Sequence, residues 1–213
     1  MIDQIIKENT GVHDDNLPGF QNHDGLWFGV NEHNSYFRLA EKIHHNYPNV
    51  KKILEIGSGA GSLSSWLRFL NKDYEIVTVD GNENILDSPY IINNYHFVIR
   101  TDQEYHLVDI KSQTFKFDLV LCYEHLEHIE KEALPKWFEM LNKHTSPGSI
   151  FLGSASTLDY NPRVHVTLES KEWWQQQFST VGWSVLDVNV LNQETKPFNF
   201  EIANTNELTF IKL

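Results

Sequence analysis

Residues 52–62 read KILEIGSGAGS, and this stretch decides the fold. A short apolar run, KILEI (52–56), ends at Gly57, and a turn with a glycine at every second position follows. The apolar residues of 63–70 then recur at i, i+3, i+4 and i+7, which is the spacing of one helix face. Glycine allows positive φ and close approach of a ligand, which then meets the N–H groups of the first helical turn. The stretch therefore predicts a strand, a ligand-binding turn and a helix.

An acidic residue further along favours a nucleoside ligand over a bare phosphate. The run YEIVTVD (74–80) predicts the next strand and ends in Asp80. A carboxylate at that place can accept hydrogen bonds from both hydroxyls of a ribose. The alternative is a tight turn without a ligand, and the flanking strand, the helix and Asp80 together disfavour it. The spacing of Gly57, Gly59 and Gly61 differs from the Gly-x-Gly-x-x-Gly of dinucleotide sites, and no P-loop Lys follows.

The rest of the chain alternates strands with helices. Runs typical of strands stand at 52–56, 74–80, 105–110, 117–123, 149–155, 183–190 and 207–213, and 95–99 competes with 105–110 as the third strand. Helical spacing recurs at 34–47, at 63–70, after Pro135 and from Ser170 to Gly182. We expect an α/β, Rossmann-like three-layer sandwich with a mostly parallel seven-stranded sheet. Because no helix separates the last two strands, we expect an antiparallel C-terminal hairpin strand.

Composition excludes several classes of protein. The 213 residues include 29 acidic and 17 basic side chains, a net charge of −12, which disfavours a nucleic-acid partner. The single cysteine, Cys122, excludes an internal disulfide framework and indicates a cytoplasmic protein. No apolar run approaches the roughly 20 residues of a membrane span, and MIDQIIKENT (1–10) does not read as a secretory signal.

The glycine turn resembles the first motif of class I S-adenosylmethionine-dependent methyltransferases, an acid, one apolar residue and Gly-x-Gly-x-Gly. Residues 55–61 match every defined position of that motif, and the resemblance covers about residues 50–155. It implies S-adenosylmethionine as cofactor and S-adenosylhomocysteine as product. It also implies that Asp80 holds the ribose, that Asp109-Ile110 meets the adenine, and that Tyr123–Ile129 follows the fourth strand.

The resemblance gives a set of expected cofactor-binding residues. They are Glu55, Gly57, Ser58, Gly59, Gly61, Asp80, Gly81, Asp109, Ile110 and Tyr123. The spacing between Asp80 and Asp109 is longer than a compact family member needs, so either an insertion stands between them or Asp102 is the adenine contact. We prefer Asp109, because it ends an apolar run just before the FDLV strand.

Two histidines are candidate catalytic residues. His165 stands in a loop before a Trp-rich helix, a segment similar to one in several small-molecule methyltransferases, and it reads as a general base or as a loop anchor. His128 is the second candidate, and its match to the Glu-His-Ile of the family favours a structural role for it. Glu124, Glu127 and the neighbouring histidines could suggest a metal site. Their spacing is not His-Glu-x-x-His, and we predict no metal.

These observations predict one domain and one activity. The domain spans 1–213, with a lid and helical segment at 1–48, a cofactor-binding core at 49–155 and a substrate side at 156–213. Phe20, Trp27 and Phe28 are candidate lid residues. The predicted activity is methyl transfer to an O or N atom of a small molecule such as a saccharide. The alternatives are a non-catalytic S-adenosylmethionine-binding protein and, disfavoured by the glycine spacing, an NAD-dependent oxidoreductase. The sequence identifies neither the acceptor nor the oligomeric state.

Overall fold

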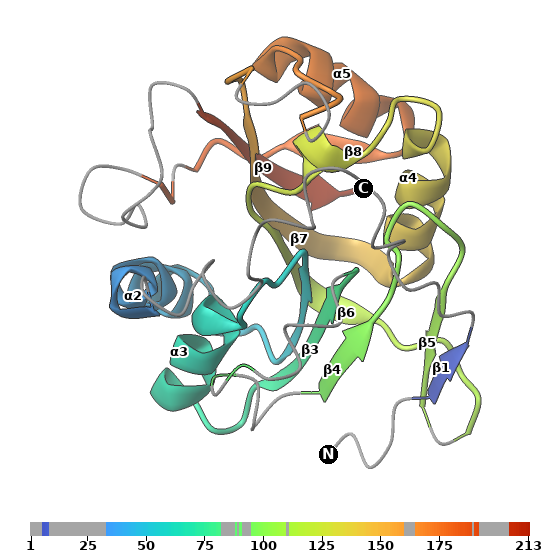
Figure 1. Ribbon diagram of the computed structural model, residues 1–213. Helices are drawn as coiled ribbons and strands as arrows, with labels where there is room; N and C mark the ends of the chain where they lie inside the picture. The colour runs from blue at the N-terminus through green and yellow to red at the C-terminus, as the bar shows by residue number, and fades with distance from the viewer. Residues whose placement is uncertain are drawn as a thin grey trace.

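A computed structural model of the protein is shown in Figure 1. It describes residues 6–8, 33–81, 88, 90, 95–109, 111–159, 165–188, 190–191 and 205–213. The candidate lid residues Phe20, Trp27 and Phe28 lie outside these residues, as does Ile110. In the described part, none of the helices combines the length and the apolar character that crossing a bilayer requires.

The core of the fold is a seven-stranded sheet in the order β4-β3-β2-β6-β7-β9-β8. The strands are β4 (Tyr95–Val98), β3 (Glu75–Asp80), β2 (Lys52–Ile56), β6 (Phe117–Cys122), β7 (Thr145–Ser156), β9 (Thr205–Lys212) and β8 (Trp183–Val185). The first five run parallel, whereas β9 pairs antiparallel with both β7 and β8. The predicted fold class is therefore confirmed, although β8 is shorter than the predicted run 183–190.

Helices cover both faces of the sheet, as Figure 1 shows. One face carries α2 (Phe37–Asn46), which follows the 3-10 helix η1 (His33–Tyr36), and α3 (Ser62–Leu70). The other carries α4 (Leu134–Lys143) and α5 (Lys171–Thr180). Neighbouring residues of a strand point to opposite faces, so that Ile53 joins the core under α2 and α3 while Leu54 joins the core under α4 and α5. This double burial explains the continuous apolar runs in the sequence.

The predicted third strand is wrong. Tyr95–Val98 pairs with β3 at the sheet edge, whereas β5 (His106–Val108) pairs antiparallel with β1 (Ile6–Glu8) in a separate two-stranded sheet. Leu107 is fully buried, and the amide of Phe115 donates to its carbonyl across a tight turn. The apolar run at 105–110 thus predicted burial correctly, but it did not indicate the strand with which it pairs.

The predicted end signals of α5 are confirmed. The side chain of Ser170 accepts a hydrogen bond from the amide of Trp173 at 3.2 Å, which satisfies one free N–H of the first turn. Gly182 follows the helix with φ of 91°, a left-handed conformation that glycine adopts without a steric penalty. Short-range capping chemistry therefore marks both ends of this helix in the sequence.

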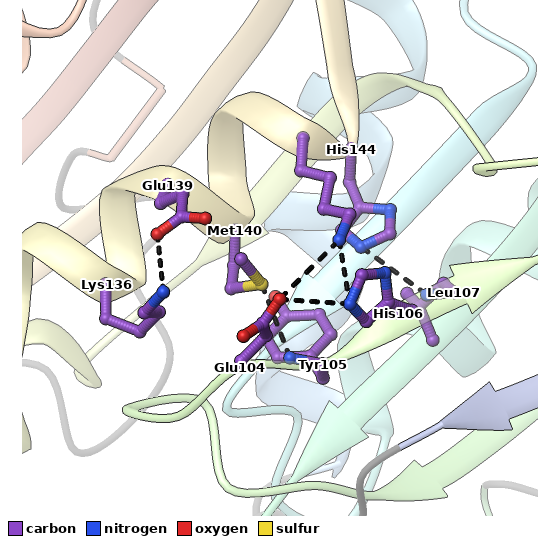
Figure 2. A network of polar contacts seen from close by, with 9 residues as sticks. Glu104, Tyr105, His106, Leu107, Lys136, Glu139, Met140 and His144 are labelled. Carbon is purple, nitrogen blue, oxygen red and sulfur yellow. Dashed lines mark hydrogen bonds and ion pairs between the residues drawn. The ribbon is translucent and has the colours of Figure 1, made fainter.

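A polar network joins α4 to β5 (Figure 2). Lys143 Nζ lies 2.8 Å from His106 Nε2, which lies 3.1 Å from a Glu104 carboxylate oxygen. Beside them His144 is fully buried and stacks on the ring of Tyr105. Its Nδ1–H donates to the Phe115 carbonyl at 3.0 Å, and its Nε2 accepts from a backbone amide of β5 at 3.4 Å. Burial lowers the pKa of His144 to about 4, so the ring is neutral in the folded protein at pH 7.

We expect His144 to make the protein sensitive to mild acid. The folded pKa of about 4 lies below the unfolded value of about 6.5, so this contribution to stability is complete above pH 6.5 and is lost as the pH falls through 4. The loss is about 3 kcal/mol at most. Urea unfolding of wild-type and His144→Gln protein between pH 7.5 and 4.5 checks it, and the variant should have the flatter profile. A His45→Gln control, at an exposed position, should keep the wild-type slope. Parallel profiles for wild type and His144→Gln would contradict the assignment.

Candidate functional site

The glycine turn after β2 forms the base of the candidate site. Gly57, Gly59 and Gly61 all have positive φ, at 70°, 49° and 75°, a region that other residues rarely occupy. The amides of Gly57 and Ser58 both donate to the carbonyl of Val79, at 2.9 and 3.3 Å, so the turn stays fixed to the end of β3. Gly61 is the N-cap of α3. The turn therefore brings the N-terminus of α3 to the carboxyl edge of the parallel strands, where such sheets bind ligands.

Asp80 lies beside this turn, as the sequence predicts. It is the last residue of β3, and one of its carboxylate oxygens accepts a hydrogen bond from the amide of Gly59 at 2.9 Å. Gly81 follows directly and is buried. Within the described part of the chain, the buried hydroxyl of Ser58 has no hydrogen-bond partner. A buried polar atom without a partner is costly, and this hydroxyl remains available for a hydrogen bond at the turn.

Glu55 lies below the turn on the α3 side of the sheet. It is buried, and the hydroxyl of Ser64 in α3 donates to its carboxylate. Burial raises the pKa of Glu55 to about 7; the hydrogen bonds from Ser64 oppose that rise, and the negative charge of Asp80 adds to it. Glu55 thus ties the end of β2 to the first turns of α3 and places a second carboxyl group under the glycine turn.

The segment after β4 lies on the other side of the turn. Thr101 is buried, and its hydroxyl lies 2.8 Å from Nε2 of His125 in the segment after β6. The Asp102 carboxylate forms a two-point ion pair with Arg100, at 3.1 and 2.6 Å. Because β4 is the strand next to β3, this segment occupies the place at which the sequence analysis expected Asp109.

Asp109 lies elsewhere, so its expected place at the end of the third strand of the main sheet is wrong. It follows β5, and its carboxylate accepts hydrogen bonds from the amides of Lys111 and Gln113 at 2.8 and 3.0 Å. Asp109 therefore caps its own tight turn. The long spacing between Asp80 and Asp109 has a physical cause, because β4, the strand next to β3, lies between them in the sequence.

Tyr123 follows β6 on the same side as Glu55. It is half-buried and packs beside the core under α2 and α3. Burial raises the pKa of its phenol well above the usual value, and the charge of Glu207 acts in the same direction. The ring therefore remains neutral, and its hydroxyl can both donate and accept hydrogen bonds.

A cluster of possible metal ligands follows the same strand. The cluster consists of three residues, each of which offers one possible ligand atom, and these three atoms lie within 4.8 Å of one another. The residues are Glu127, His128 and His165. Glu127 and His128 belong to the 3-10 helix η3 (Leu126–His128), whereas His165 comes from the loop before α5. The rings of His128 and His165 meet edge to face, with centroids 5.0 Å apart. The two histidines that the sequence analysis selected thus lie side by side.

Backbone hydrogen bonds bring the His165 loop to η3. The amides of Val166 and Thr167 both donate to the carbonyl of Glu127, at 2.8 and 3.0 Å, and the Thr167 hydroxyl donates to the carbonyl of Ile129. His165 Nδ1 lies 2.8 Å from the Leu158 carbonyl. Because a carbonyl only accepts, Nδ1 carries the proton, and the lone pair of the neutral ring lies on Nε2.

Glu127 is the residue of this cluster that the sequence analysis did not select. Its side chain is fully buried, and among the described residues neither carboxylate oxygen has a partner at hydrogen-bond geometry. Burial raises its pKa well above the usual value, the charge of Glu124 adds to the rise, and the amides of Glu127 and Ser156 oppose it only in part. A buried carboxylate of this kind is stabilised by a cation. The available signal was the spacing Glu124-x-x-Glu127-His128, which the prediction from sequence compared only with His-Glu-x-x-His.

Glu124 lies next to the cluster in an unusual conformation. Its φ is 48°, which is rare for a residue with a side chain. The Ser154 hydroxyl accepts from the Glu124 amide at 3.0 Å and donates to its carboxylate at 2.7 Å. Ser154 on β7 thus holds a second, partly buried carboxyl group near Glu127.

Comparison with known proteins identifies the relatives of the chain. A family model described as a methyltransferase domain matches residues 30–205. A ribosomal protein L11 methyltransferase of Prochlorococcus marinus is 32% identical over 125 residues, which is 56% of this chain and 41% of that protein. A small RNA 2'-O-methyltransferase of Mus musculus is 28% identical over 160 residues, which is 67% of this chain and 39% of that protein. The chain thus spans about two fifths of each relative.

Solved structures share the fold. The N-methyltransferase NodS from Bradyrhizobium japonicum, in complex with S-adenosyl-L-homocysteine, superposes with a TM-score of 0.61 at 15% identity. The match covers 92% of this chain and 96% of that chain. A similarity at such low sequence identity shows a common fold and does not identify the methyl acceptor. The names of the relatives above include a ribosomal protein and small RNA.

Proposed function

Because the chain belongs to the methyltransferase domain family, we propose that it transfers the methyl group of S-adenosylmethionine to a hydroxyl oxygen of a sugar-type small molecule. A divalent cation held by Glu127, His128 and His165 assists the transfer. The observation that carries this proposal is the buried Glu127 carboxylate, unpaired among the described residues and placed against two imidazole rings.

The residues at the glycine turn fit the cofactor. Asp80 offers a carboxylate for the ribose, the glycine turn ends at the N-terminus of α3, and the buried Ser58 hydroxyl offers one more polar atom. Asp102 and Thr101, rather than Asp109, are proposed to face the adenine, because they follow the strand next to β3. S-adenosylmethionine supplies a methyl group on a sulfonium, so the protein has to orient the acceptor and exclude water.

The cluster after β6 fits a divalent cation. Two imidazoles and a carboxylate form a mixed donor set, which suits ions such as Mn²⁺, Fe²⁺ or Zn²⁺ better than Ca²⁺. Glu124 offers a further, partly buried carboxyl group beside the set. A cation bound there would supply a Lewis acid for the acceptor oxygen. His128 and His165 then serve as ligands, and the hydrogen bond from His165 to the Leu158 carbonyl fixes the orientation of its ring.

A hydroxyl acceptor explains why a methyltransferase would carry this cluster. An alcohol is a weak nucleophile until it loses its proton, and a Lewis acid that binds the oxygen makes that proton easier to remove. Neighbouring hydroxyls of a sugar can both approach one cation, since hard oxygen donors suit divalent ions. The acidic chain, with a net charge of −12, favours an uncharged sugar over a phosphate-bearing acceptor.

A second candidate acceptor is a ribose 2'-hydroxyl in RNA. The similarity to the mouse small RNA 2'-O-methyltransferase favours it, and a ribose offers the same hydroxyl chemistry. The net charge disfavours it, because affinity for RNA depends on basic side chains that release counterions.

Turnover with matched acceptors tests the proposal. Purified protein with S-adenosylmethionine and Mn²⁺ would be offered neutral saccharides, nucleosides, a short single-stranded RNA, the same strand ending in a 2'-deoxynucleotide, and primary amines. We expect S-adenosylhomocysteine to form with saccharides or nucleosides and not with amines. Turnover with RNA that the terminal deoxynucleotide abolishes would support the second candidate. Turnover with amines alone, independent of Mn²⁺, would contradict O-methylation.

A further inference from the structure

His125 occupies an unusual place between the two halves of the cofactor site. It follows β6, yet its ring packs against the first glycine of the turn after β2. A Cβ atom added at Gly57 would lie 2.5 Å from His125 Nδ1 and 2.6 Å from Cγ. The absence of a side chain at Gly57 is therefore what lets the ring approach the turn so closely.

The same ring reaches the segment after β4. His125 Nε2 lies 2.8 Å from the Thr101 hydroxyl, and Thr101 is buried. The residue after Thr101 is Asp102, whose carboxylate is ion-paired with Arg100. A single imidazole thus contacts the glycine turn on one side and the start of the Thr101–Asp102 segment on the other. No backbone ladder joins these two parts directly, because β4 pairs with β3 and not with β2.

We propose that His125 is a positioning residue for the cofactor, which holds the Thr101–Asp102 segment at a fixed distance from the glycine turn so that the adenosine part of S-adenosylmethionine fits between them. This inference rests on the proposed function. His125 acts through the position of Thr101 and takes no part in the transfer. Its loss should weaken cofactor binding and leave the methyl-transfer step intact.

A double-mutant cycle on His125 and Thr101 tests the proposal, with the affinity for S-adenosylhomocysteine measured by calorimetry. Thr101→Val removes the hydroxyl and keeps the shape, and we expect Kd to rise about 10-fold, as for the loss of one buried hydrogen bond. His125→Ala should raise Kd by about 10-fold to 30-fold. If His125 acts through Thr101, the double variant should bind no more weakly than His125→Ala alone.

Two further variants separate positioning from a general effect on folding. Thr101→Ser keeps the hydroxyl and should bind within about twofold of wild type, and His125→Gln should recover part of the affinity because its amide can reach Thr101. In turnover, His125→Ala should raise KM for S-adenosylmethionine with kcat almost unchanged.

The possible outcomes distinguish this inference from the function on which it rests. Wild-type affinity in Thr101→Val, additive effects in the double variant, or a fall in kcat at constant KM would each overturn the role of His125. The proposed cofactor and acceptor would survive those results. Failure of the wild-type protein to bind S-adenosylhomocysteine would instead overturn the proposed function.

Discussion

Replacing Glu127 by Gln is expected to lower kcat by at least about 100-fold and to remove any stabilisation by Mn²⁺. The change keeps the size of the side chain and removes the charge that the cluster offers to a cation. Loss even of a residue that only supports a metal ligand costs about 10-fold to 100-fold in affinity or activity, and Glu127 is itself a proposed ligand. Thermal unfolding supplies a readout besides turnover, because a bound cation at 100 times its Kd stabilises the folded state by about 2.7 kcal/mol.

The Glu127→Gln variant also distinguishes the loss of cation binding from a general loss of folded protein. Without metal, Glu127→Gln should be at least as stable as wild type, because burial penalises the charged form of the Glu127 carboxyl group and the amide carries no charge. Glu130→Gln is the matched control, since Glu130 is exposed and lies outside the cluster. It should retain both turnover and stabilisation by Mn²⁺. Wild-type turnover in Glu127→Gln, or undiminished wild-type turnover in excess EDTA, would exclude a catalytic cation.

Local signals explain which parts of the fold could be predicted. The glycine turn, Asp80 and the cap at Ser170 act within a few residues of themselves or at a strand end, so sequence spacing describes them well. The prediction of the third strand required knowledge of which strand each apolar run pairs with in the folded protein. Tyr95–Val98 and His106–Val108 are both extended, and only the assembled sheet decides that β3 takes the former. The predicted position of Asp109 was wrong because the strand before it, β5, pairs outside the main sheet.

The candidate cation cluster could be predicted only in part. Glu127 and His128 are neighbours in sequence, but a carboxylate next to a histidine is common and does not by itself indicate a metal. His165 was selected separately as a base or a loop anchor. The hydrogen bonds of Val166 and Thr167 to the Glu127 carbonyl join two segments that are far apart in the sequence. They bring the three side chains together in the folded structure. Burial of Glu127 without a partner among the described residues is likewise a property of packing, invisible in a single sequence.

Replacing Gly57 by Ala is expected to raise Kd for S-adenosylhomocysteine by about 100-fold. Two costs combine at this position. The left-handed φ of 70° costs a residue with a side chain roughly 1–2 kcal/mol. The new Cβ would also lie 2.5–2.8 Å from three atoms of His125, and relieving such overpacking costs about 1–3 kcal/mol. Since His125 cannot keep both its place against the turn and its contact with Thr101, the cofactor site itself must deform. Calorimetry on the purified variant measures the effect.

Gly148→Ala is the control that isolates the collision from the backbone strain. Gly148 has a φ of 89°, and a Cβ added there would meet nothing within 4 Å. Its variant should lose stability by about 1–2 kcal/mol and bind S-adenosylhomocysteine as wild type does. Combining Gly57→Ala with His125→Ala should relieve the collision and return Kd toward that of His125→Ala alone. Wild-type affinity in Gly57→Ala would mean that the turn and the ring move apart at little cost, and His125 could then not fix the width of the cofactor site.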